Sequence, residues 1–130
     1  MQQNDLMDLL MLEKKIYNSL NEVQDLTQQL TEAVDRQDQV SVRMLLEMRQ
    51  EPIDIIEETQ SRLLERQIAL GGEDAARLRA LLQGGAPARQ AEQPLADQIA
   101  ANRRLLGKVV EQDRRLSQRL GGKSSFYQKP

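Results

Sequence analysis

A long run of regularly spaced positions near the N-terminus constrains this chain more than any other feature. One face repeats at alternating spacings of four and three through Ile16, Leu20, Val23, Thr27, Leu30 and Val34. Such spacing turns one side of a slightly underwound α-helix toward a partner helix. A helix of about 30 residues is roughly 45 Å long at ~1.5 Å rise per residue, and it cannot bury that side alone. A further helix, from this chain or from a second copy, must therefore cover it.

The composition favours an all-α protein without catalytic chemistry. Aromatic residues make up 2% of the 130 residues and charged residues 29%, in a mixture rich in helix-forming Leu, Gln, Glu and Arg. The sequence contains no cysteine and no histidine. Disulfides, thiolate or imidazole metal sites, and catalytic schemes that need either residue are thereby excluded. We expect a single helical domain over residues 1–130 that is not an enzyme and holds no metal and no cofactor.

Hydropathy and charge restrict the kind of partner. No apolar stretch approaches the ~20 residues needed to span a membrane, so we expect a cytoplasmic protein without membrane insertion. Residues 1–36 carry a net charge of −4, residues 37–94 of −3 and residues 95–130 of +5. The basic segment can pair with the acidic first helix or attract an acidic partner. Nucleic acid is disfavoured, because three aromatic residues give no stacking platform.

Periodicity and helix-ending residues predict an elongated antiparallel hairpin joined by further helices. The predicted helices span residues 3–36, 39–70, 73–83 and 94–120. Asp38 is the expected N-cap of the second helix, and Gly71 begins the glycine pair that should end it. Pro52 removes a backbone donor, and we expect a kink there. The glycine- and proline-containing linker 84–94 should be the most mobile interior segment, and the tail 121–130 should be flexible.

Both ends of the chain carry more apolar surface than one helical seam requires. The first two turns, from Leu6 to Leu12, are apolar around nearly their whole circumference. Either two helices cover them or they meet a partner, to which flexible Met7 and Met11 would adapt. In the last helix the alternating register runs through Leu95, Ile99, Asn102, Leu106, Val109, Asp113, Leu116 and Leu120, with Leu105 and Val110 on its flanks. Its polar positions indicate either a core that fixes register or a binding face.

The chain resembles the small helical export chaperones of the bacterial flagellum, the FlgN type first and the FliT type second. The resemblance rests on the long first helix, the segment VRMLLEMR at Val42–Arg49, the run Ala101–Leu106, and Tyr127 after the last helix. It implies binding of the amphipathic terminal helix of a late export substrate, a hook-associated or filament-cap subunit. It also implies that premature assembly is prevented and that the subunit is delivered to the type III export apparatus.

The expected partner site lies on the last helix and the tail. A cargo helix would bury its apolar face against this region by helix-in-groove recognition. The candidate contacts are Asn102, Leu105, Leu106, Val109, Val110, Phe126 and Tyr127. The alternative is that this helix is core and that the tail rings fold back on it. A competing function is a structural coiled-coil scaffold whose seams are satisfied by self-association, for example as a homodimer.

Overall fold

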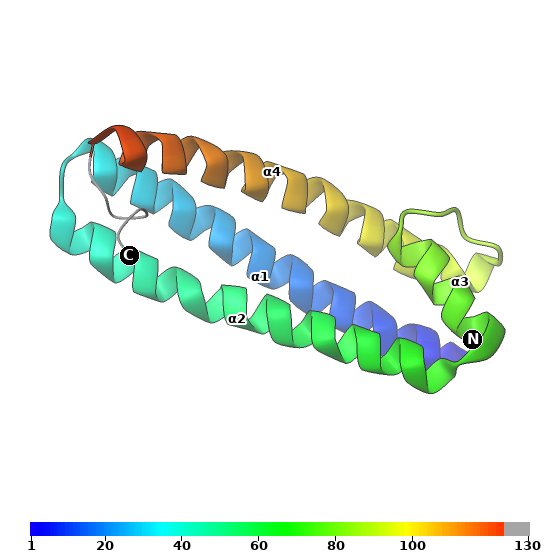
Figure 1. Cartoon of the computed structure of the whole chain (residues 1–130). Helices are drawn as coiled ribbons and strands as arrows, with labels where there is room; N and C mark the ends of the chain where they lie inside the picture. The colour runs from blue at the N-terminus through cyan, green and yellow to red at the C-terminus, as the bar shows by residue number, and fades with distance from the viewer. Residues whose placement is uncertain (124–130) are drawn as a thin grey trace.

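The protein is an elongated bundle of α-helices (Figure 1). The computed structural model describes residues 1–123, and the side chains of residues 1–121. The elements are α1 (Gln3–Asp35), α2 (Gln39–Leu70), α3 (Gly72–Leu82), the 3₁₀ helix η1 (Gln90–Glu92) and α4 (Gln93–Lys123). No strand occurs between residues 1 and 123. The predicted all-α antiparallel hairpin is confirmed, and α4 returns along α1 (Figure 1).

α1 is the central helix of the bundle, because both other long helices pack on it. Every residue of the predicted seam is buried, including Thr27, whose hydroxyl donates to the carbonyl oxygen of Val23 at 2.7 Å. α1 contacts α2 and α4, whereas no Cα atom of α2 lies within 8 Å of one of α4 in the described part of the chain. The outer two long helices are thus held apart by the one between them.

The predicted hairpin signals operate at both ends of α2. The carboxylate of Asp38 accepts hydrogen bonds from the backbone N–H of Ser41 at 3.1 Å and from its hydroxyl at 2.6 Å, which confirms the N-cap. Gly71 ends α2 with φ of 62°, a conformation that costs glycine little. α2 runs continuously through Pro52, so the proline does not break the arm.

α4 extends beyond its predicted end. The helix passes through Gly121 and Gly122 to Lys123, so the expectation that this glycine pair ends the helix and opens the tail is wrong. Neither glycine has to adopt the left-handed conformation that stops a helix, since neither has a positive φ. The candidate contacts Phe126 and Tyr127 lie outside the described residues.

The linker between α3 and α4 is tied to α3 by a buried ion pair. Glu92 is 2% exposed, and its Oε1 accepts from Arg77 Nε at 3.0 Å and from the Ala88 N–H at 2.9 Å. Burial opposes ionisation, but these hydrogen bonds and the charges of Arg77 and Arg89 outweigh it and lower the pKa of Glu92. These contacts tie part of the linker 84–94 to α3, and its mobility stays a prediction.

The core consists of two apolar clusters along the bundle. The first, beside the α1–α2 turn, we call the turn half; it contains Leu26, Leu30, Ala33, Val34, Val42, Leu45, Leu116 and Leu120. The second, at the end where α3 joins, we call the α3 half; it contains Leu6, Leu9, Ile16, Leu20, Val23, Leu63, Leu78, Leu81, Leu95, Ile99, Leu105 and Val109. Three helices build the turn half, and α3 is added only in the α3 half.

Candidate partner-binding groove

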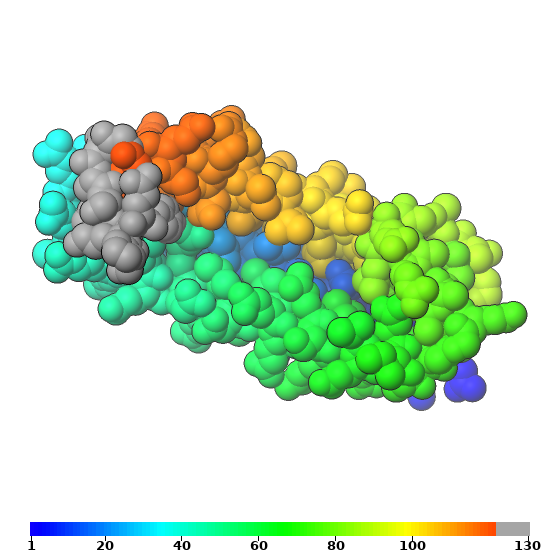
Figure 2. Space-filling model, viewed as in Figure 1, coloured from blue at the N-terminus to red at the C-terminus, as the bar shows by residue number. Residues whose placement is uncertain are grey.

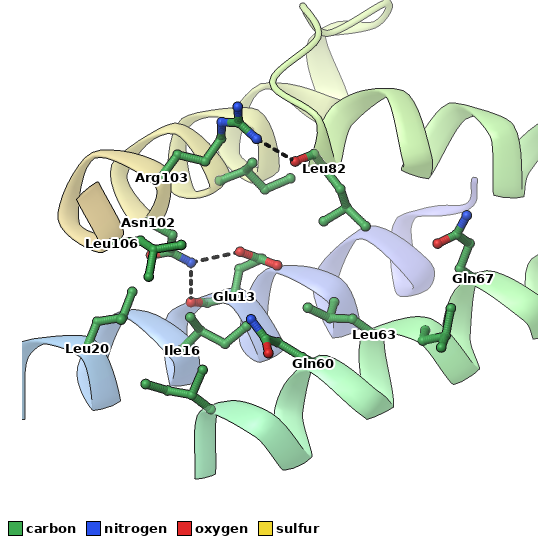
Figure 3. A pocket seen from close by; sticks show the side chains of 13 residues that line it. Glu13, Ile16, Leu20, Gln60, Leu63, Gln67, Leu82, Asn102, Arg103 and Leu106 are labelled. Carbon is green, nitrogen blue, oxygen red and sulfur yellow. Dashed lines mark hydrogen bonds between the residues drawn. The ribbon is translucent and has the colours of Figure 1, made fainter. Parts of the chain in front are cut away.

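A groove of about 380 Å³ opens in the α3 half between α2 and α4. Figure 2 shows it as a hollow in which α1 is visible between the outer helices. Its floor comes from α1, its walls from α2 and α4, and α3 contributes Leu82 at one end (Figure 3). The lining residues are Glu13, Ile16, Leu20, Ile56, Gln60, Leu63, Leu64, Gln67, Leu82, Ile99, Asn102, Arg103 and Leu106.

The groove exists because α2 and α4 are linked only near its two ends. At one end α3 packs against both helices, and Arg103 Nη1 donates to the Leu82 carbonyl oxygen at 3.2 Å. Farther toward the turn half, Arg49 Nη2 of α2 lies 2.9 Å from Asp113 Oδ1 of α4. The Arg49 side chain is 8% exposed, so this ion pair is largely covered on its basic side. Between these two links the outer helices leave an open channel.

Both rims of the groove carry exposed apolar side chains. On α2, Leu64 is 57% exposed and Ile68, one turn farther on, is 71% exposed. On α4, Leu106 is 45% exposed and Val110, again one turn on, is 59% exposed. Residues four apart share one face of a helix, so each pair forms an exposed apolar stripe that begins in the groove wall and continues beyond it. Leu64 and Leu106, which line the groove, offer contact area to an apolar ligand.

The floor of the groove holds a buried polar pair. Asn102 Nδ2 donates to the Glu13 carbonyl oxygen at 2.8 Å and to Glu13 Oε1 at 2.7 Å, and Gln98 Nε2 donates to Asn102 Oδ1 at 3.1 Å. Glu13 is 5% exposed and Asn102 is 6% exposed. Burial raises the pKa of Glu13, and the hydrogen bond from Asn102 opposes that rise only in part. The pair joins α1 to α4 beneath the apolar rims.

The structure divides the candidate contacts on α4 into two groups. Asn102, Leu105 and Val109 are buried against α1, whereas Leu106 is exposed and lines the groove. Val110 is exposed one turn farther on, outside the groove lining. The expectation that Leu106 lies in the seam and Leu105 on its flank is therefore wrong. Spacings of 102–105–109 and 102–106–109 both fit a helical period, and only the direction of α1 selects the first.

Sequence reasoning missed the opposite wall and the floor. Ile56, Gln60 and Leu64 of α2 face the groove, and Glu13 of α1 lies under it. A usable signal was the polar Gln60 and Gln67 within the apolar register of α2, since polar residues at such positions are typical of a side that no helix covers. Nothing in the sequence indicated that Glu13 is buried, because a glutamate beside two lysines is expected to be exposed to solvent.

The apolar N-terminal turns are covered only in part. Leu6 and Leu9 are buried, whereas Met7 and Met11 remain 50% and 67% exposed. Each expectation thus holds for different residues: helices cover Leu6 and Leu9, whereas Met7 and Met11 stay exposed.

The basic α4 pairs with the acidic α1 in one ion pair among the described side chains, Arg119 Nη1 to Asp35 Oδ2 at 2.7 Å.

Neither a metal site, nor a membrane-spanning helix, nor a related protein assigns a function to the described residues. Within the described residues, no group of three or more His, Cys, Asp or Glu could hold a metal ion, and no helix has the length and apolarity to cross a membrane. No protein-family model, curated protein or solved structure matches the chain.

Proposed function

We propose that this protein is an export chaperone of the bacterial flagellum, of the FlgN or FliT type, and that the groove between α2 and α4 holds the terminal amphipathic helix of its cargo. The cargo would be a hook-associated or filament-cap subunit, bound in the cytoplasm, kept from premature assembly and passed to the type III export apparatus. The family and cargo rest on the sequence resemblance. The proposed binding mode rests on the separation of α2 from α4 and on the exposed apolar side chains of both helices.

The arrangement of the three helices around the groove supports a helix as ligand. An α-helix with side chains is about 10–12 Å across and needs flanking surfaces on either side of its apolar stripe. A helix laid along the groove would contact α1 below, Leu64 on one side and Leu106 on the other. It would occupy the fourth position of a four-helix bundle, which α3 fills at only one end.

The exposed apolar area favours reversible binding. Full burial of a Leu, Ile or Val side chain contributes roughly 1.5–3 kcal/mol, and the four rim residues, at 45% to 71% exposure, would gain part of that each. Association and the ordering of a peptide consume much of the gain. We therefore expect a dissociation constant on the order of micromolar, which permits release at the export apparatus.

Paired alanine variants test the groove. Leu64→Ala with Leu106→Ala should weaken binding of a cargo terminal-helix peptide at least tenfold, while the melting temperature changes little because these groove-lining side chains are already 57% and 45% exposed. Val40→Ala with Met44→Ala is the matched control, since these residues are 77% and 54% exposed on α2 and do not line the groove. Calorimetric titration measures both. Equal losses in the two variants would argue against the groove.

Self-association is the second candidate function. It is favoured by exposed Val40, Met44 and Met48, which follow one another at four-residue spacings on α2 outside the groove. A scaffold should form a stable homo-oligomer that ignores cargo, whereas a chaperone should form a one-to-one cargo complex. Size-exclusion chromatography with light scattering separates the two, and in a scaffold the Val40→Ala with Met44→Ala variant would dissociate the oligomer.

A further inference from the structure

The carboxyl group of Glu13 is an unusual feature for the floor of an apolar groove. It lies among the groove-lining side chains, framed by Ile16, Leu63 and Asn102 (Figure 3). The residue is 5% exposed, yet no ion pair within the described part of the chain includes it. Among the described residues, its carboxylate accepts one hydrogen bond, from Asn102 Nδ2 to Oε1 at 2.7 Å. A carboxylate has about four acceptor positions, so most of its capacity is unused.

The neighbouring amides prepare Glu13 to remain an acceptor. Gln98 Nε2 donates to Asn102 Oδ1 at 3.1 Å, which leaves the Asn102 amino group directed at Glu13. That donor stabilises the ionised carboxylate, whereas burial raises the pKa of Glu13 and favours the neutral acid. A positive charge arriving in the groove would resolve this conflict, because it would offset the loss of hydration.

Within the described residues, no cation forms an ion pair with Glu13. Arg103 also lines the groove, but its guanidinium Nη1 donates to the Leu82 carbonyl oxygen at 3.2 Å and not to Glu13. Lys14 and Lys15 follow Glu13 in α1, but both are exposed and neither lines the groove. Successive residues of a helix point about 100° apart, which directs them away from the floor. The carboxylate of Glu13 is therefore left open to a cation carried by the ligand.

We propose that the ligand of the groove is an amphipathic helix that carries a Lys or Arg within its apolar stripe, and that this cation pairs with Glu13. The proposal rests on the proposed helix-binding function and adds the chemistry that selects the helix. A long basic side chain can lay its methylene stem along Leu63 and Leu106 while its charged end reaches the carboxylate. A ligand with only apolar residues there would seal Glu13 from water without a partner.

Three synthetic helical peptides test the selection. They share one leucine stripe and differ at its central position, which is Lys, Leu or Glu, and binding is followed by fluorescence anisotropy. The wild-type protein should bind the Lys peptide at least tenfold more tightly than the Glu peptide and at least threefold more tightly than the Leu peptide. In Glu13→Gln the preference for Lys over Leu should vanish. Glu22→Gln is the matched control, because Glu22 is an exposed glutamate of the same helix, and it should keep the preference.

Proton exchange gives a second readout that needs no variant. At a pH between the ordinary pKa of glutamate and the raised pKa of Glu13, the Lys peptide should cause proton release, since a cation lowers the pKa of Glu13. The Leu peptide should cause proton uptake, since it increases burial. Calorimetry in buffers of different ionisation enthalpy measures both.

The outcomes separate the two proposals. If the wild type binds no peptide of the set, the helix-binding function itself is overturned. If the Leu peptide binds as tightly as the Lys peptide, or Glu13→Gln keeps the Lys preference, the groove remains a helix site and the pairing with Glu13 is overturned. Proton uptake with both peptides overturns the pairing even where Glu13→Gln fails to fold.

Discussion

The turn half and the α3 half use the same three long helices but bury different chemistry. In the turn half, α1, α2 and α4 close around an apolar cluster that includes Leu30, Leu45 and Leu116. In the α3 half the same helices surround buried Glu13 and Asn102 and leave a groove between α2 and α4. The Arg49–Asp113 ion pair lies toward the boundary between the two.

The same three helices thus form a closed apolar cluster at one end and a groove above a buried polar pair at the other. A fully apolar core gains stability from every buried side chain. A buried carboxylate costs stability unless it is paired, so its presence in the α3 half is better explained by a task than by folding. The chain thus separates a stabilising half from a half that keeps a cavity.

The largest effect should come from a cavity in the turn half. Leu30 is 0% exposed, and Leu30→Ala should lower the free energy of unfolding by about 2–5 kcal/mol, as is usual for large-to-small changes in a core. Leu64→Ala removes the same atoms from the groove wall, where the side chain is 57% exposed, and should cost less than about 1 kcal/mol. Denaturant unfolding measures both. Similar losses would show that the halves do not differ as described.

A smaller effect should follow from breaking the ion pair at the boundary. Asp113→Asn should cost about 1–3 kcal/mol, because it removes the ion pair with the largely buried Arg49, although Asp113 itself is 44% exposed. Asp35→Asn breaks the Arg119 pair, which is about half exposed on both sides, and should cost at most ~1 kcal/mol. Thermal and denaturant unfolding of the two variants side by side should preserve this order, and a reversed order contradicts it.

The smallest effect should be a pH dependence specific to the α3 half. The folded pKa of Glu13 is raised above its ordinary value of 4.5, so its contribution to stability is present below about pH 4.5 and is lost as pH rises through the folded pKa. Glu13→Gln should remove that loss, so that the variant gains on the wild type as pH rises from about 4.5 through the folded pKa of Glu13, with a slope of at most ~1.4 kcal/mol per pH unit.

Unfolding at several pH values checks this slope. Glu22→Gln, which removes an exposed glutamate from the same helix, should run parallel to the wild type. If Glu13→Gln loses stability relative to the wild type as pH rises, the sign assigned to Glu13 is wrong.

Local signals in the sequence predicted much of the architecture. The register from Ile16 to Val34 required a covered helix, Asp38 marked the start of α2, and Gly71 marked its end. These features act within a few residues, through helical period, a capping carboxylate and a left-handed backbone, so they can be read from the chain itself. Gly121 and Gly122 show the limit, since glycine permits a helix end without imposing one.

The site depended on tertiary structure. The sequence placed Leu106 and Val110 in a partner site but joined them to Leu105 and Val109, because all four fit a broad apolar face. Which of them is core depends on the direction from which α1 approaches α4. Glu13 became distinctive only when Asn102, 89 residues away in sequence, packed on it. The sequence by itself thus determined that long helices form and must associate. Only their packing decided which polar groups are buried and where a groove remains, because burial and pairing depend on contacts between residues far apart in the chain.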